Sequence, residues 1–164
     1  MRYAGHFVRK AILSKLVGNI DIGLGVLPIY GRVPDSTTYP YCIVRTEETS
    51  ETDQNQSTFI SQVNTSIEIV TRFATDDGGS LSAQQYADAI LQVIRTRSAN
   101  YMDMSEDGFN VYVQEFSGIN NIEEAYSDYY YYRTIINLIV KVEQTVSGSS
   151  LDGLQNDLQF DLQS

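Results

Sequence analysis

Alternation of side chains over residues 129–143 is the feature that most limits the fold of this 164-residue chain. Successive side chains of a β-strand point to opposite faces of a sheet, so the segment YYYYRTIINLIVKVE predicts one long strand with two different faces. The more apolar row, which we expect to face a core, is Tyr130, Tyr132, Thr134, Ile136, Leu138, Val140 and Val142. The other row is Tyr129, Tyr131, Arg133, Ile135, Asn137, Ile139 and Lys141.

The second row is too apolar for open solvent and too charged for a core. Tyrosine and arginine together are favoured at the centres of protein interfaces. We therefore predict that Tyr129, Tyr131, Arg133 and Ile135 belong to a subunit or partner interface.

Other segments repeat the strand pattern. Residues 58–73 alternate as a long strand with one buried face, and 41–48 and 109–116 form shorter strands. The polar residues 49–57 are typical of a hairpin tip or a mobile loop, and 117–128 are typical of a second, acidic connection.

Two segments have helical spacing. Apolar residues over 4–17 form one stripe, with the basic side chains mostly on the opposite side. Ser82 and Gln85 fit a capping box that begins a second helix, which runs to about Arg97. Strand pairs without crossover helices predict an α+β domain: a single-layer, mainly antiparallel sheet of four to five strands with two helices packed on one face.

We expect this domain to span residues 1–144, followed by an extended C-terminal tail, 145–164. The tail has a Ser/Gly hinge at 147–150 and then alternates polar and apolar residues, the apolar ones being Leu158, Phe160 and Leu162. Such a segment can add a strand to the sheet edge of a neighbour. A disordered terminus is the alternative.

Composition argues against several classes of function. The net charge of −10 argues against binding to a nucleic-acid backbone, although a surface past which DNA slides would also be acidic. The single cysteine allows no intrachain disulfide and favours a reducing compartment. No apolar run approaches the ~20 residues of a membrane span, so we expect no membrane partner.

Catalytic and ligand-binding motifs are weak. His6 and Cys42, the only histidine and the only cysteine, are expected at a solvent edge and in a buried strand rather than in a dyad. Residues 103–114 approach a calcium loop but end in Gln114 instead of glutamate, and they lead into a strand pattern. GLGVLP at 23–28 precedes a strand rather than a helix. We expect no catalytic residue, no metal and no cofactor.

The order of elements, together with three local sequences, carries a resemblance to a known family. These sequences are YPYCIV at 39–44, SIEIVTRF at 66–73 and SAQQYADAILQVI at 82–94, followed by a final pair of strands. Over roughly residues 4–144 the chain resembles the tail terminator, or tail completion, proteins of long-tailed bacteriophages.

The resemblance implies a structural virion protein and not an enzyme. It would form a ring, usually sixfold, that caps the finished tail tube, stops its polymerisation and joins the tail to the head-side connector. Its partners would be further copies of itself, the tail tube protein and a connector or neck protein, with DNA passing through the lumen without specific binding. It would be assembled in the host cytoplasm and reside in the virion.

Three alternatives stay open: a neck or connector adaptor, a tail-tube-like subunit, and a small enzyme or ligand-binding domain. In a ring, the basic first helix, with Arg9 and Lys10, would meet acidic loops of the next subunit. A polar hairpin would contact the tube or the connector through Glu51, Asp53, Gln54, Asn55 and Gln56.

Overall fold

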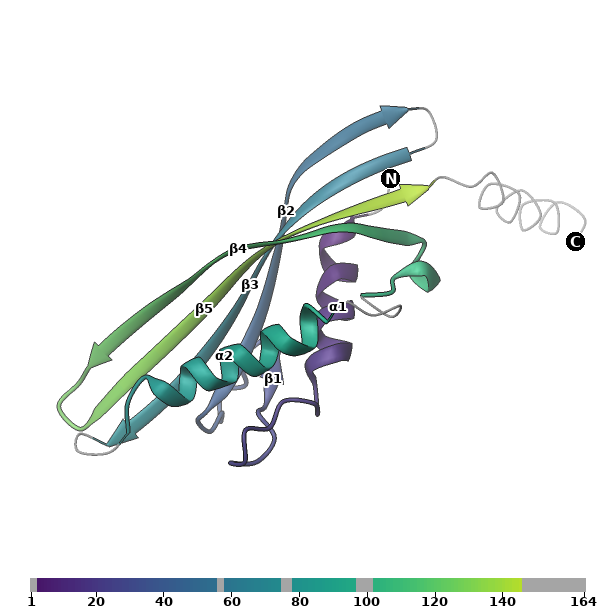
Figure 1. The fold of residues 1–164 in the computed structure, drawn as a ribbon. Coiled ribbons are helices and arrows are strands. Elements are labelled where there is room, and N and C mark those ends of the chain that lie inside the picture. The colour runs from purple at the N-terminus through teal and green to yellow at the C-terminus, as the bar shows by residue number, and fades with distance from the viewer. Residues whose placement is uncertain (1–2, 56–57, 75–77, 97–101, 146–164) are drawn as a thin grey trace, which may run out of the picture.

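The computed structural model describes residues 3–55, 58–74, 78–96 and 102–145. Over these residues the chain has the predicted α+β fold, with two α-helices and a curled, mainly antiparallel five-stranded sheet that forms a half-barrel (Figure 1). The elements are α1 (Ala4–Leu16), β1 (Ile29–Tyr30), β2 (Tyr41–Asn55), β3 (Thr58–Ala74), α2 (Leu81–Ile94), the 3₁₀ turn η1 (Ser105–Asp107), β4 (Phe109–Ala125) and β5 (Tyr129–Thr145).

The strands follow the order β1-β2-β3-β5-β4 across the sheet. β1 is parallel to β2, and every other neighbouring pair is antiparallel. The last strand in sequence therefore lies between β3 and β4 and is paired along its length on both sides, which explains why it carries the strongest strand pattern.

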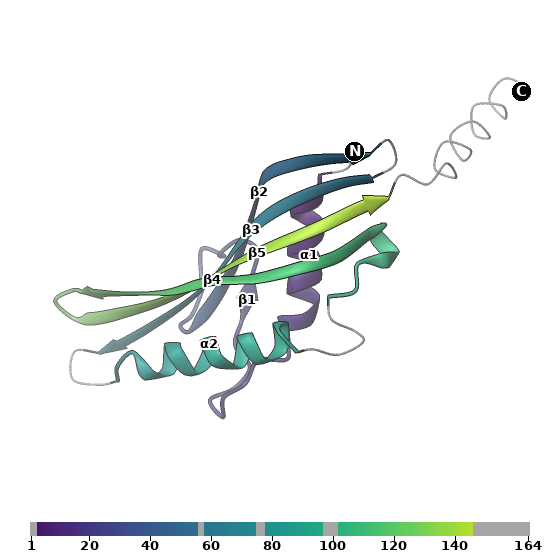
Figure 2. The same cartoon turned by 45° about the horizontal axis from the view of Figure 1, so that its top comes forward.

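Both helices pack on the same face of the sheet, as Figures 1 and 2 show from two directions. The core between them includes the predicted apolar row of β5, in which Thr134, Ile136, Leu138, Val140 and Val142 are all buried. Cys42 and Val44 of β2 join the same core. The predicted division of β5 into two faces is thus confirmed, although Tyr130 and Tyr132 at its start are only half-buried.

The polar residues 49–55 are strand and not loop, so this part of the predicted hairpin tip is wrong. β2 continues to Asn55, and its pairing with β3 extends to the partners Asn55 and Thr58, with irregularities after Glu48 and Asp53. Backbone N–H and C=O groups supply the pairing of a ladder, so polar side chains do not stop it.

The second predicted connection is wrong for a similar reason, because β4 continues through 117–125. A register shift lies between Phe116 and Gly118, and Gly118 has a φ of 145°, which a residue without Cβ adopts readily. The true turn is short: the Tyr126 N–H donates to the Tyr129 carbonyl oxygen at 2.8 Å.

The first helix lies where predicted, but the boundaries of the second differ. α2 begins at Leu81 with Ser80 as its N-cap and has no side-chain capping hydrogen bond, so Ser82 and Gln85 form no capping box. The helix ends at Ile94, before the predicted Arg97, which lies outside the described residues. Neither described helix is long and apolar enough to cross a membrane.

Candidate functional site

The face of the sheet that the helices do not cover, called here the open face, carries the candidate site. Residues paired directly across strands point to the same side, so the second row of β5 defines this face. Ile135, Asn137, Ile139 and Lys141 are half-buried on it. The mixed character predicted for this row is therefore present in the structure.

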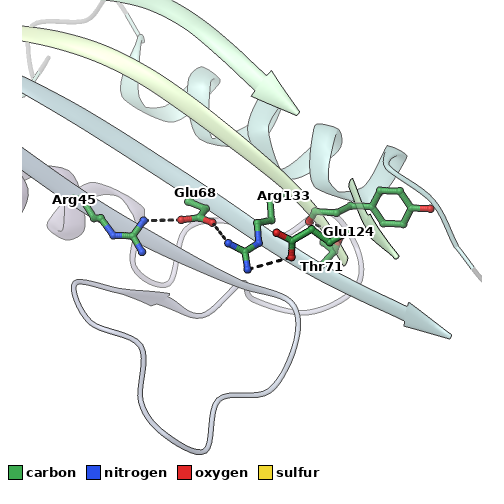
Figure 3. Close-up of polar contacts among 6 residues, drawn as sticks. Arg45, Glu68, Thr71, Glu124 and Arg133 are labelled. Atoms are coloured by element: carbon green, nitrogen blue, oxygen red, sulfur yellow. Dashed lines mark hydrogen bonds and ion pairs between the residues drawn. The ribbon is translucent and has the colours of Figure 1, made fainter. Parts of the chain in front are cut away.

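A chain of ion pairs crosses the open face and takes one residue from each of the four long strands (Figure 3). Arg45 Nη1 of β2 donates to Glu68 Oε2 of β3 at 2.6 Å, and Arg133 Nη1 of β5 donates to Glu68 Oε1 at 3.3 Å. Arg133 Nη2 also lies 3.5 Å from Glu124 Oε2 of β4. The planar guanidinium groups suit this bridging because they present several donors in fixed directions.

Glu68 is the centre of this chain and is nearly enclosed. Its side chain is 8% exposed, whereas those of Arg45 and Arg133 are 56% and 38% exposed. A buried carboxylate is tolerated because both oxygens accept charged hydrogen bonds. Arg133, which was predicted as an interface residue, therefore has a structural contact within its own chain.

A group of aromatic side chains lies beside the ion pairs, and we call it the tyrosine cluster: Tyr39, Tyr41, Tyr126, Tyr129 and Tyr131. The segment that leads into β2 through a cis Tyr39–Pro40 peptide brings the Tyr39 ring to 5.6 Å from the Tyr131 ring. The Arg72 guanidinium lies 4.5 Å from the Tyr39 ring and 4.6 Å from the Tyr129 ring. Partial burial, and then the neighbouring tyrosines, raise the pKa of Tyr39.

The strand 58–73 was predicted to bury only one face. This is wrong near the ion pairs, where side chains on the open face are buried as well. Ile43, Glu68 and Val70 are buried there. Val70 is flanked in register by Tyr41 and Arg133, whose long side chains cover apolar surface with their stems and rings.

The sequence segments that carry the family resemblance contain Tyr39, Glu68 and Arg72, but none of the three was predicted as a site residue. Glu68 is the only acidic residue of 58–73, between two isoleucines, and that position was the available signal.

The middle of the open face is hollowed, beyond the ion pairs. The hollow has a volume of about 570 Å³ and is lined by Arg45, Thr46, Glu47, Asn64, Thr65, Ser66, Ser117, Asn137, Leu138 and Ile139. The open face thus has two parts, a tyrosine and arginine end and a polar hollow.

The other predicted interface residues are placed differently. Lys10 Nζ of α1 lies 3.0 Å from Asp107 Oδ1 of η1, so the basic helix and an acidic turn meet within one chain. Arg9 is half-buried on the same helix. Glu51, Asp53, Gln54 and Asn55 lie in β2, and Gln56, Leu158, Phe160 and Leu162 lie outside the described residues.

The nucleophile and metal motifs have ordinary structural roles. Cys42 is fully buried, and burial followed by the charge of Glu68 raises its pKa to about 12, so the thiolate does not form at neutral pH. His6 is exposed and lies against Phe7, with ring centroids 3.8 Å apart, as expected for a solvent-edge histidine.

In the calcium-like loop, Asp103 Oδ1 accepts a hydrogen bond from the Ser105 N–H at 2.9 Å. Hydrogen bonds from Ser105 lower the pKa of Asp103. η1 then leads directly into β4, as the strand pattern predicted, and not into the exiting helix of a calcium loop. No cluster of three metal-ligating side chains occurs within the described ranges.

Comparison with known proteins gives no further guide: no protein-family model matches the chain, and a search of curated proteins finds no match.

Proposed function

We propose that this chain is a structural subunit of a bacteriophage tail, which assembles into a ring, caps the tail tube, stops its polymerisation and joins the tail to the head-side connector. The observation that carries the proposal is the open face. It holds tyrosines, arginines and half-buried isoleucines. This is the composition of the centre of a protein interface. Both helices lie on the other side of the sheet (Figure 2).

The shape of the sheet supports ring formation. A ring needs two different surfaces that meet head to tail and close by rotation. Within the described residues, β4 forms one edge of the sheet, and β1 pairs with β2 only at Cys42 and Ile43, so most of β2 forms the other. The curled sheet presents these two unlike edges on opposite sides of the subunit (Figure 1).

The proposed partners follow from this role. The ring would contact the tail tube protein on one side and a connector or neck protein on the other, as part of the virion. DNA would pass through its lumen, and the net charge of −10 supports passage without adhesion.

The test is the state of the full chain in solution. We expect light scattering after size-exclusion chromatography to give a multiple of 18.4 kDa, and negative-stain images to show closed rings. Long open tubes would instead favour a tube-like subunit. A monomer at high concentration, both alone and with tail tubes, would overturn the proposal.

A further inference from the structure

The outer edge of β4 is one of the two open edges of the described sheet. Its backbone groups on that side have no strand partner among the described residues. Three of its large apolar side chains are also exposed: Phe116 by 37%, Ile119 by 39% and Ile122 by 42%. Proteins usually shorten, charge or cover such an edge, because it pairs readily with another chain.

Two of these side chains lie on the helix side of the sheet. Phe116 pairs with Leu138 and Ile119 pairs with Ile136, and both partners are buried in the core. α2 packs on β3 and β5, and the Arg95 guanidinium at its C-terminal end lies 5.8 Å from the Phe116 ring. The core therefore continues to an edge at which Phe116 and Ile119 are still partly exposed.

We propose that the C-terminal segment 146–164 of a second copy of this chain adds a strand to the edge of β4. Leu158, Phe160 and Leu162 alternate with polar residues, so one face of such a strand is apolar. That face would lie beside Phe116 and Ile119 and extend the core. This inference rests on the proposed ring, because it states how neighbouring subunits hold one another.

The position at which the segment leaves the domain favours a second copy over the same chain. β5 ends at Thr145, next to the start of β4, since Gln144 pairs with Phe109. Residues 146–157 span at most roughly 40 Å when extended, whereas the 17 residues of β4 cover about 55 Å.

A segment that turned back onto its own β4 would run parallel to it unless the linker were almost fully extended. The segment of a neighbour can approach antiparallel, which is the more stable pairing.

Charge gives this docking a distinctive response to salt. The segment carries Asp152, Asp157 and Asp161 and no basic residue, and β4 exposes Glu115 and Glu123. Because like charges repel and salt screens them, added salt should strengthen the contact. Docking on the basic helix α1 would be weakened by salt instead.

Cysteine cross-linking between two co-expressed, differently tagged copies tests the proposal. One copy carries Ile119→Cys and the other Phe160→Cys, and Cys42 is buried and does not interfere. Under mild oxidation we expect a disulfide-linked heterodimer, with a yield at least fivefold above the control pair Asp88→Cys and Phe160→Cys and higher at 0.5 M than at 0.05 M salt. Asp88 is exposed on α2.

Two results would overturn the inference. One is a heterodimer yield no higher than that of the control pair. The other is a double variant, Ile119→Cys with Phe160→Cys, that forms its disulfide only within single chains.

A second pair of variants separates this inference from the ring itself. Ile119→Glu should reduce the assembly to single copies, while Leu81→Glu, at a more exposed apolar position on α2, should leave it intact. If the unmodified chain never assembles, the proposed function fails together with the inference. If rings form and Ile119→Glu does not affect them, only the inference fails.

Discussion

The two faces of the sheet bury different kinds of side chain. The helix side of β3 and β5 is filled with aliphatic side chains, such as Ile67, Ile136 and Val140, which are fully buried. The open side instead encloses one carboxylate, Glu68, between two arginines that remain partly exposed. The contrast indicates that the helix side forms the apolar core of the monomer, whereas the open side holds polar contacts and leaves part of its aromatic surface exposed.

Equal cavities on the two sides of the sheet should have the largest and most different effects on stability. Ile135 and Ile136 are neighbours on opposite faces of β5, the first half-buried and the second fully buried. We expect Ile136→Ala to lower the free energy of unfolding by about 2–5 kcal/mol, because it leaves a cavity in the core. Ile135→Ala should cost roughly 1 kcal/mol, since its side chain already meets solvent.

Urea denaturation followed by circular dichroism, at a concentration low enough to keep the chain monomeric, gives both values. Equal losses for the two alanine variants would mean that the open face is as much a core as the helix side.

The second prediction concerns the ion pairs. Glu68→Gln keeps the shape of the side chain but loses the charge that both arginines contact. We expect a loss of about 1–2 kcal/mol, less than for a fully buried pair, because the arginines are partly exposed and screened by solvent. Glu47→Gln, at an exposed position on the same face, is the control and should change stability by less than about 0.5 kcal/mol.

Thermal or urea unfolding of these two variants measures the difference. If Glu68→Gln were as stable as the unmodified protein, the chain of ion pairs would orient the side chains without adding to the free energy of unfolding. The assembled state should then be examined for a change in this variant.

Strand alternation predicted the two faces of β5 because its apolar row is unbroken. It failed at β4, where Phe116 and Ile119 face the same side although they are three residues apart. The register shift at Gly118 interrupts the alternation of side chains between the two faces of the sheet. The sequence therefore lacks the regular strand pattern there and resembles a loop. The polar extension of β2 was not predicted, because its pairing with β3 depends on backbone hydrogen bonds. These bonds do not require any particular type of side chain.

The arrangement of the candidate site was less accessible to sequence reasoning. Glu68 contacts Arg45, 23 positions away, and Arg133, 65 positions away, and only the sheet order brings them together. Tyr131 was predicted because tyrosine and arginine adjoin in its segment. Its contact with Tyr39 depends on the course of the segment before β2, for which no local pattern exists.

The buried thiol on the helix side should make stability depend on pH. The pKa of Cys42 is raised from 9.0 to about 12, so between these values the folded chain keeps a proton that the unfolded chain releases. Its contribution to stability is therefore complete below about pH 9 and is lost as the pH rises from 9 towards 12. Between pH 8 and 10 the unmodified chain should lose on the order of 1 kcal/mol more than Cys42→Ala.

Urea midpoints for both proteins at the two pH values check this difference. Tyr39 and Tyr86, whose pKa values are also raised by burial, titrate in both proteins and cancel in the comparison. Parallel pH profiles, or rapid labelling of the native thiol at pH 8, would contradict the buried position of Cys42.

The smallest expected effect on folding comes from the tyrosine cluster, and it separates folding from assembly most cleanly. Tyr129 is 42% exposed and contacts Arg72, so Tyr129→Ala should change the unfolding free energy of the monomer by about 0.5 kcal/mol. Because aromatic residues at the centre of an interface contribute strongly to binding, the same substitution should nevertheless weaken assembly about tenfold or more. Tyr131 and Arg133 serve this test less well, because Tyr131 packs against two other tyrosines and Arg133 holds Glu68.

Tyr3→Ala is the matched control, since Tyr3 is 55% exposed but precedes α1, away from the open face. A dilution series by analytical ultracentrifugation gives the assembly constant of each variant, and chemical unfolding at low concentration gives its monomer stability. Weaker assembly for Tyr129→Ala alone, with both monomers intact, would assign the exposed end of the tyrosine cluster to contacts between subunits. Equal assembly constants for Tyr129→Ala and Tyr3→Ala would mean that the tyrosine cluster is not part of the interface. The loss of any exposed aromatic ring would then explain the effect.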